Sequence, residues 1–179
     1  MENNKLVADL SNTGIKGYIN RGYGIMNEDV TQSESGIVFD NEGRDLNVFP
    51  MFAVDFSEYI ASENIQIENV RSIEMVAVVY DEAGSELDLS SEYQKCAFVS
   101  KNALDGFSTS DILPSGNYKV IGSNVVTTFD LTKFTGYTGD GKNLTQSTLA
   151  DGAGINIQIL NGGHEKLRYL VISSLAFVL

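Results

Sequence analysis

The chain has 179 residues with 24 acidic and 12 basic side chains, which gives a formal net charge of −12. A surface of this sign repels the phosphate backbone of nucleic acids, so we expect no nucleic-acid partner. The single cysteine cannot form an internal disulfide, and no stretch approaches the roughly 20 apolar residues that span a bilayer, so no membrane partner is expected. The start of the chain lacks the basic and apolar segments of a signal peptide, which predicts synthesis in the cytoplasm.

Residues 1–35 are predicted to form an irregular N-terminal arm, separate from the domain formed by residues 36–179. This segment has no regular apolar period, and glycine allows positive φ angles and close backbone approach. Its glycines are interleaved with apolar side chains at Gly14, Ile15, Gly17, Tyr18, Ile19, Gly22, Tyr23 and Gly24. Such a segment suits either a loop or an extended contact on another surface.

From residue 36 onwards, short apolar or alternating runs are separated by turn residues, a pattern typical of the strands of an all-β sandwich. The first runs, residues 36–39 and 46–56, flank a polar segment with Gly43 at its bend, which predicts a hairpin. Two further hairpins are predicted, one between residues 73–80 and 93–99 and one between residues 155–160 and 167–172.

Two more strands and two short helices complete the prediction. Residues 118–121 and 125–131 are rich in apolar and β-branched side chains and are separated by a Gly-Ser-Asn turn. Residues 57–64 and 144–151 are the helical candidates, the second closed by Gly152. The fold class that follows is all-β: an antiparallel β-sandwich with the irregular arm and one or two short helices.

The chain is poor in the side chains that most enzymes use. His164 is the only histidine and lies in an Asn-Gly-Gly-His turn, and Cys96 is expected within an apolar strand. A zinc site of the usual ligand sets, a histidine base and a cysteine nucleophile are therefore not expected, and we predict a protein that is not an enzyme and has no cofactor. Two carboxylates across a cleft, as in glycoside hydrolases, stay open because 24 acidic residues offer many candidates.

Acidic side chains concentrate in one part of the chain. Residues 28–92 contain 16 acids but only two bases, Arg44 and Arg71, which gives a local charge of −14. Such a block is either a set of solvated loops or a docking surface for a basic partner or calcium. Calcium is the one metal considered, at residues 40–45 or 81–88, although Arg44 occupies a position where a ligand would be needed.

The chain ends on an apolar run, residues 169–179, without a polar tail. Consecutive apolar residues place apolar side chains on both faces of a strand, so both faces need cover. That cover is either the interior of the protein's own sandwich or a neighbouring subunit, and the second option favours an assembly protein.

Two segments resemble β-sandwich modules of the jelly-roll kind, found in carbohydrate-binding domains and in virion fibre and decoration proteins. Residues 125–136 are similar to the strand that leaves the sheet through an Asp-Leu-Ser/Thr step, and residues 76–84 are similar to an apolar strand that ends in an Asp-x-x-Gly turn. The resemblance implies a jelly-roll-like fold. Sugar-binding members commonly use tryptophan, which this chain lacks.

These observations lead to the hypothesis of a non-enzymatic structural or interaction protein, most specifically a bacteriophage-type virion component such as a capsid decoration or fibre-base protein. It would act by self-assembly into a homo-oligomer and by docking on other virion proteins. The alternative is a carbohydrate-binding module with a tyrosine-lined glycan groove, and a two-carboxylate glycoside hydrolase is the third possibility. The tyrosines considered for the groove are Tyr18, Tyr23, Tyr59 and Tyr137. The residues predicted to contact other subunits are Ile15, Tyr18, Ile19, Tyr23, Ile25, Leu175, Phe177 and Leu179.

Overall fold

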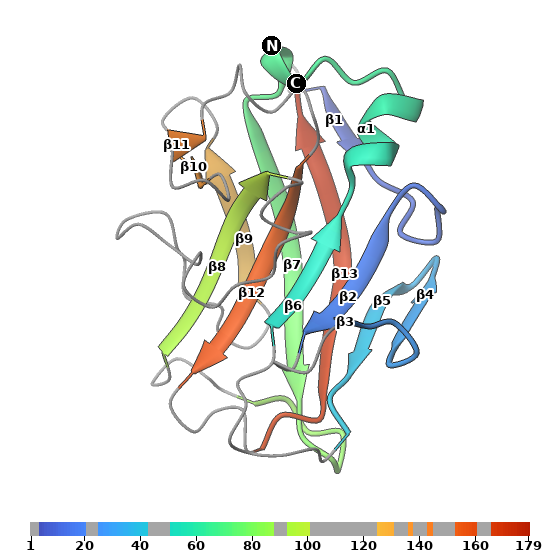
Figure 1. Ribbon diagram of the computed structural model, residues 1–179, viewed down its shortest axis with the longest axis vertical. Coiled ribbons are helices and arrows are strands. Elements are labelled where there is room, and N and C mark those ends of the chain that lie inside the picture. Colours follow the sequence, from blue (N-terminus) through green and yellow to red (C-terminus); the bar gives the residue numbers. More distant parts are fainter. Residues whose placement is uncertain are drawn as a thin grey trace.

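The protein, as a computed structural model, is described over residues 4–20, 25–42, 51–87, 93–100, 125–130, 136–137, 143–144, 153–160 and 166–179. Its strands form two sheets that face one another as a sandwich, with a short helix at one end (Figure 1). The N–H of Leu179 donates to the carbonyl of Asn4 at 2.9 Å, so the two ends of the described chain lie side by side.

Sheet A consists, in spatial order, of β4 (Val30–Ser33), β5 (Gly36–Asp40), β13 (Tyr169–Val178), β7 (Ser72–Tyr80) and β9 (Val125–Asp130), with β1 (Lys5–Val7) beside the second half of β13. These strands pair antiparallel. The C-terminal strand β13 is central, since β7 lies along one side of it and β5 and then β1 lie along the other.

Sheet B consists, in spatial order, of β11 (Asn143–Leu144), β10 (Gly136–Tyr137), β8 (Tyr93–Ser100), β12 (Ala153–Leu160), β6 (Met51–Asp55), β2 (Lys16–Asn20) and β3 (Ile25–Met26). The strands from β8 to β3 pair antiparallel, and β10 meets β8 in parallel. Figure 1 shows β8, β12, β6 and β2 running along the length of the molecule in front of sheet A.

Side chains that alternate along the strands fill the space between the sheets. On β7 the inward residues are Ile73, Met75, Ala77 and Val79, all fully buried. Phenylalanine rings join the two sheets: Phe39 meets Phe52 edge-to-face with ring centroids 5.5 Å apart, and Phe56 meets Phe177 at 5.4 Å. Such aromatic pairs add about 0.5–1.5 kcal/mol to the effect of burial alone, so they favour this particular packing of the sheets.

Successive long strands alternate between the sheets. Strands β5 and β7 lie in sheet A, whereas β6 and β8 lie in sheet B. Strand β12 then inserts between β6 and β8, and β13 inserts between β5 and β7. This is the strand order of a jelly roll, so the all-β, antiparallel, jelly-roll-like sandwich expected from the sequence is confirmed.

The three predicted hairpins are wrong, because each divides its two strands between the sheets. Strand β5 pairs with β4 and β13 rather than β6, β7 pairs with β13 and β9 rather than β8, and β12 pairs with β6 and β8 rather than β13. Turn residues mark a reversal of the chain but do not distinguish a hairpin within one sheet from a crossing to the other. The connecting residues 43–50, 88–92 and 161–165 lie outside the described part.

The described part of residues 1–35 is not an irregular arm. It contributes β1, β2, β3 and β4, with β2 paired along β6 and β1 paired with β13. Ile15, just before β2, and Gly17 and Ile19 within it are all buried, so they follow the period of two that a strand requires. The glycine in the middle of this series conceals the apolar alternation in the sequence.

The helix expected over residues 57–64 is confirmed as α1 (Ser57–Ser62), followed by a 3-10 turn, η1 (Ile67–Asn69). Strand β9 agrees with the strand expected over residues 125–131. The strand expected at residues 118–121 lies outside the described part, as does nearly all of the helix expected at residues 144–151. Within the described ranges, no helix has both the length and the apolar character needed to cross a bilayer.

Candidate functional site

Half of the residues predicted to contact other subunits lie in the core. Ile15, Ile19, Leu175 and Phe177 are each at most 1% exposed and pack between the two sheets. Ile19 lies on β2, Leu175 and Phe177 lie on β13, and Ile15 comes just before β2. All four side chains point to the interior of the sandwich. These side chains hold the sandwich together and are not available to a partner while it is folded.

The other predicted contacts are spread over the surface. Ile25 on β3 is 45% exposed and Leu179 is 37% exposed. Tyr18 on β2 is half-buried, and Tyr23 lies outside the described residues. The prediction omitted Val7 on β1, which is 60% exposed, because no apolar pattern in its surroundings distinguishes it.

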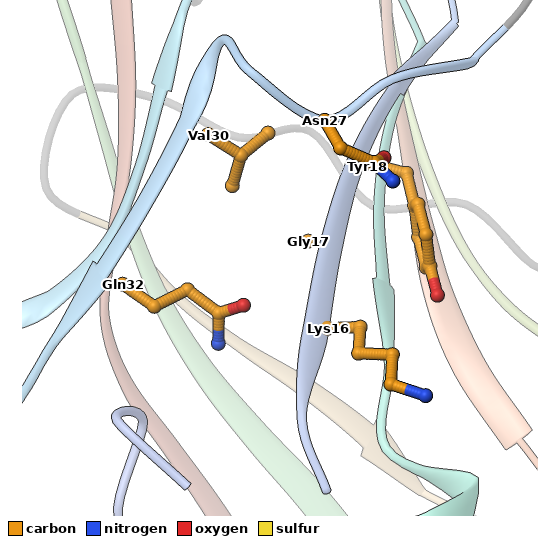
Figure 2. Close-up of a pocket in the computed structure, with 6 residues that line it drawn as sticks. All are labelled: Lys16, Gly17, Tyr18, Asn27, Val30 and Gln32. Carbon is orange, nitrogen blue, oxygen red and sulfur yellow. The ribbon is translucent and has the colours of Figure 1, made fainter. Parts of the chain in front are cut away.

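A small pocket opens at the side of the sandwich, where β4 of sheet A faces β2 of sheet B. Its lining residues are Lys16, Gly17, Tyr18, Asn27, Val30 and Gln32, and its volume is about 190 Å³. Figure 2 shows Val30 and Gln32 directed from β4 towards β2, whereas the side chains of Lys16 and Tyr18 are directed away from β4. Pockets for small-molecule ligands usually measure about 300–1,000 Å³, so this one suits a single side chain.

Gly17 and Gln32 set the distance between the two sheets at this pocket. A Cβ atom at Gly17 would lie 2.7 Å from Cγ1 of Val30, so β2 approaches sheet A closely because residue 17 has no side chain. Nε2 of Gln32 donates to the carbonyls of Leu10 at 3.1 Å and Ile15 at 2.8 Å. These two hydrogen bonds connect β4 to the segment that leads into β2.

Lys16 at the pocket is held by acidic partners. Its Nζ lies 2.6 Å from Oε1 of Glu58, and this hydrogen bond is the main cause of a raised Lys16 pKa. Lys16 also lies opposite Asp55 in the sheet, and the Asp55 carboxylate accepts hydrogen bonds from the N–H and Oγ of Ser57 at the start of α1. The lysine therefore connects β2 to the helix, and its charge is already compensated.

The outer face of sheet A carries a row of valines, called here the valine row. Val38 on β5 lies opposite Val171 on β13, which in turn lies opposite Val78 on β7, and Val76 follows on the same face of β7. Val38, Val76 and Val171 remain partly exposed. The outer face of an antiparallel sheet is commonly polar because it meets water. An apolar row on this face is therefore unusual, and packing within the sandwich does not explain it.

An arginine and two carboxylates border one end of the valine row. Nε of Arg168 lies 2.8 Å from Oδ1 of Asp40, and Nη2 lies 3.2 Å from Oδ2 of Asp40 and 3.9 Å from Oε1 of Glu42. The guanidinium also lies over the ring of Tyr169, 5.2 Å from its centroid. These carboxylates belong to the loop considered for calcium, and a bound arginine is the opposite of what a cation site requires.

In the part of the chain that the structure describes, no group of three or more histidine, cysteine or acidic side chains is placed to hold a metal ion. In the other acidic loop considered for calcium, Oδ1 of Asp81 accepts a hydrogen bond from the N–H of Ser85 at 2.8 Å, as in an ordinary turn. His164 and the side chain of Cys96 lie outside the described part.

One tyrosine considered for a sugar-binding groove belongs to the core instead. Tyr59 is 3% exposed and stacks on Phe177 with ring centroids 6.0 Å apart, and this burial raises the pKa of its hydroxyl. Tyr18 is half-buried beside the pocket, whereas Tyr23 and the side chain of Tyr137 lie outside the described residues. Of the tyrosines considered for the groove, Tyr59 is therefore too buried to stack on a sugar, which leaves Tyr18 as the one described candidate.

No family model and no curated protein matches this chain. Among solved structures, the L4b domain of human laminin alpha-2 is similar, with a TM-score of 0.48, 10% sequence identity and 98% of each chain covered. The resemblance to virion and carbohydrate-binding modules that the sequence suggests therefore stays a prediction.

Proposed function

We propose that this chain is a non-enzymatic structural protein whose copies bind one another through the valine row. The observation that carries the proposal is the apolar character of sheet A on both faces at its centre. The inner face packs against sheet B, whereas no described strand lies over the outer face. Val78 is already buried in the single chain, and contact with another protein would remove the partly exposed Val38, Val76 and Val171 from water, which is the usual reason for an apolar surface patch.

A second copy of the chain is the partner that this surface suits. The valine row carries no charge, and its neighbours in register on the same face include Thr31 beside Val38 and Ser174 beside Val76. The whole chain has a net charge of −12, so two copies repel one another over most of their surfaces and approach best where charge is absent. A twofold arrangement with Val171 near its counterpart would give a self-complementary contact.

Light scattering over a wide concentration range tests this proposal. We expect an oligomer whose mean mass falls on dilution. The variant Val171→Asp places a charge in the centre of the row and should shift the protein to monomer, while Val171→Thr keeps the side-chain shape and should weaken the oligomer less. Thr13→Asp is the matched control, because it adds the same charge at an exposed turn outside sheet A.

Circular dichroism melts establish that each variant is folded before its mass is compared. A protein that is monomeric at every concentration contradicts the proposal. So does an oligomer that persists unchanged in a folded Val171→Asp variant, since the subunits would then meet elsewhere.

Within this class, the sequence favours a virion component, such as a capsid decoration or fibre-base protein. The jelly-roll strand order supports that role, but lectin domains use the same fold, so it supports a carbohydrate-binding module equally. A glycan array separates the two roles, because binding there would favour the module. A panel of glycoside substrates tests the two-carboxylate hydrolase, because hydrolysis of any of them would favour that role.

A further inference from the structure

The edge strand β4 directs backbone groups away from sheet A. The N–H of Asp40 donates to the carbonyl of Asp29 at 2.8 Å, in register with the pairing of β4 and β5. Backbone groups in an antiparallel strand point alternately to its two sides. Because the backbone carbonyl of Asp29 points to β5, the backbone N–H and C=O groups of Val30 and Gln32 point the other way, to the open side of the sandwich.

Most of these outward groups have no backbone partner in the described residues. The N–H of Val30 turns back to the carbonyl of Asn27 at 3.1 Å. The carbonyl of Val30 and both the N–H and the carbonyl of Gln32 remain directed outward, beside the pocket of Figure 2. An edge of this kind is a template for another strand.

Strand β2 leaves a matching gap across the pocket. Ile15 donates to the carbonyl of Asn12 at 3.0 Å and accepts from Gln32, so its backbone groups point away from β6. By the same alternation, the backbone N–H and C=O groups of Gly17 and Ile19 also point away from β6. The short strand β3 pairs with β2 at Ile19 but, among the described residues, no strand lies beside Gly17.

We propose that this open side binds an extended segment of another protein, which adds to sheet A as a strand beside β4. The added strand hydrogen-bonds to the carbonyl of Val30 and to the N–H and carbonyl of Gln32. One of its inward side chains enters the pocket beside Gln32, whose volume of about 190 Å³ fits a single side chain. In this mode of recognition the backbone supplies affinity and the pocket supplies selectivity.

The charge around the open side indicates a basic partner segment. Residues 25–42 contain five acidic side chains and no basic one, and two of the five, Asp40 and Glu42, lie beside Arg168. Glu28 and Glu34, which flank β4, are exposed, and the nearby Lys16 is already paired with Glu58. A segment with Lys or Arg on its outward positions therefore gains attraction, whereas β4 of a second copy would bring like charges together.

Fluorescence anisotropy with the full chain and labelled heptapeptides tests this site. The probe peptide is Lys-Val-Thr-Val-Lys-Val-Thr, and the control peptide has Glu at both Lys positions. We expect the Lys peptide to bind at least about tenfold more tightly. N-methylation of the alternate amides that face β4 should abolish binding, and N-methylation of the other amides should leave it unchanged, because only one edge of an added strand pairs with the sheet.

Protein variants test the same surface from the other side. The double variant Glu28→Lys/Glu34→Lys should reverse the preference towards the Glu peptide. The control Glu63→Lys/Glu82→Lys makes the same change in charge at exposed positions on other segments and should keep the original preference. Amide hydrogen exchange at Gln32 should slow when the peptide is bound.

Three results would overturn the proposal: binding of neither peptide, binding that is indifferent to which alternate amides are methylated, or a charge preference that only the control variant alters. The proposal is independent of the valine row. A folded Val171→Asp variant that is monomeric should still bind the peptide, and a chain that is monomeric from the start would lose the self-association proposal alone.

Discussion

Arg168 and Asp40, which are 128 residues apart in the chain, meet through two pairs of atoms at the end of sheet A where β5 finishes and β13 begins. The backbone of Arg168 takes part as well. Its N–H donates to the carbonyl of Tyr80 at 2.9 Å, and its carbonyl accepts from the N–H of Asn41 at 2.7 Å. One residue therefore connects three strands of the sheet, β5, β13 and β7.

Arg168→Met should destabilise the protein by about 1 kcal/mol, since it removes the ion pair and the Nη2 hydrogen bond to Asp40 but keeps most of the side-chain stem. The side chains of Arg168 and Asp40 are 19% and 35% exposed, which is why the effect stays moderate. Urea unfolding of both single variants and the double variant with Asp40→Asn measures the coupling. Strictly additive effects would show that the pair contributes nothing beyond its separate side chains.

Gly36→Ala should cost about 1–3 kcal/mol of unfolding free energy. Gly36 has a φ of +142°, and an added Cβ would lie 2.5 Å from the carbonyl oxygen of Ile172, where β5 meets the irregularity in β13. Gly84→Ala is the matched control, because Gly84 has a φ of +80° but open space around it. Thermal melts should show the larger loss for Gly36→Ala, and equal losses would argue against the backbone clash.

Gly17→Ala should destabilise the sandwich by about 1–3 kcal/mol, because the new methyl group overpacks the space beside Val30. Val30→Ala removes the atom that would lie 2.7 Å away. We therefore expect the double variant to be more stable than the sum of the two single effects predicts, when all three are compared by urea unfolding. A double variant that merely adds the two losses would place the strain elsewhere.

Glu58→Gln should lower stability at neutral pH and have less effect in strong base. The hydrogen bond with Glu58 raises the pKa of Lys16 above its ordinary value of 10.5. A raised pKa in the folded state stabilises the protein below the unfolded-state value, and this contribution is lost as pH rises through the folded-state value. Unfolding free energies of both proteins against pH should therefore converge above pH 10.5. A constant difference would mean that the Lys16 charge is not involved.

The class of the fold and the position of most long strands follow from the sequence alone. Side chains on the two faces of a strand alternate with a period of two, and this signal is local. Ile155, Ile157 and Ile159 carry it clearly, alternate with Asn156 and Gln158, and lie in β12. Residues 73–80 are instead a nearly continuous apolar run, which is also a local signal, and they lie in β7. The helix near residue 57 and the apolar character of the last strand are local properties too, so both could be predicted without knowledge of the fold.

Strand pairing and the burial of individual side chains depend on contacts between segments far apart in the sequence, so neither could be predicted from it. Leu6 lies opposite Phe177 in sheet A, although they stand near opposite ends of the sequence. Phe177 looks the same in the sequence whether it faces a partner or the core, and its contacts with Phe56 and Tyr59 exist only because β13 lies inside the sheet. The open side between β2 and β4 likewise depends on pairings that stop early, and backbone pairing between distant segments leaves no local pattern to read.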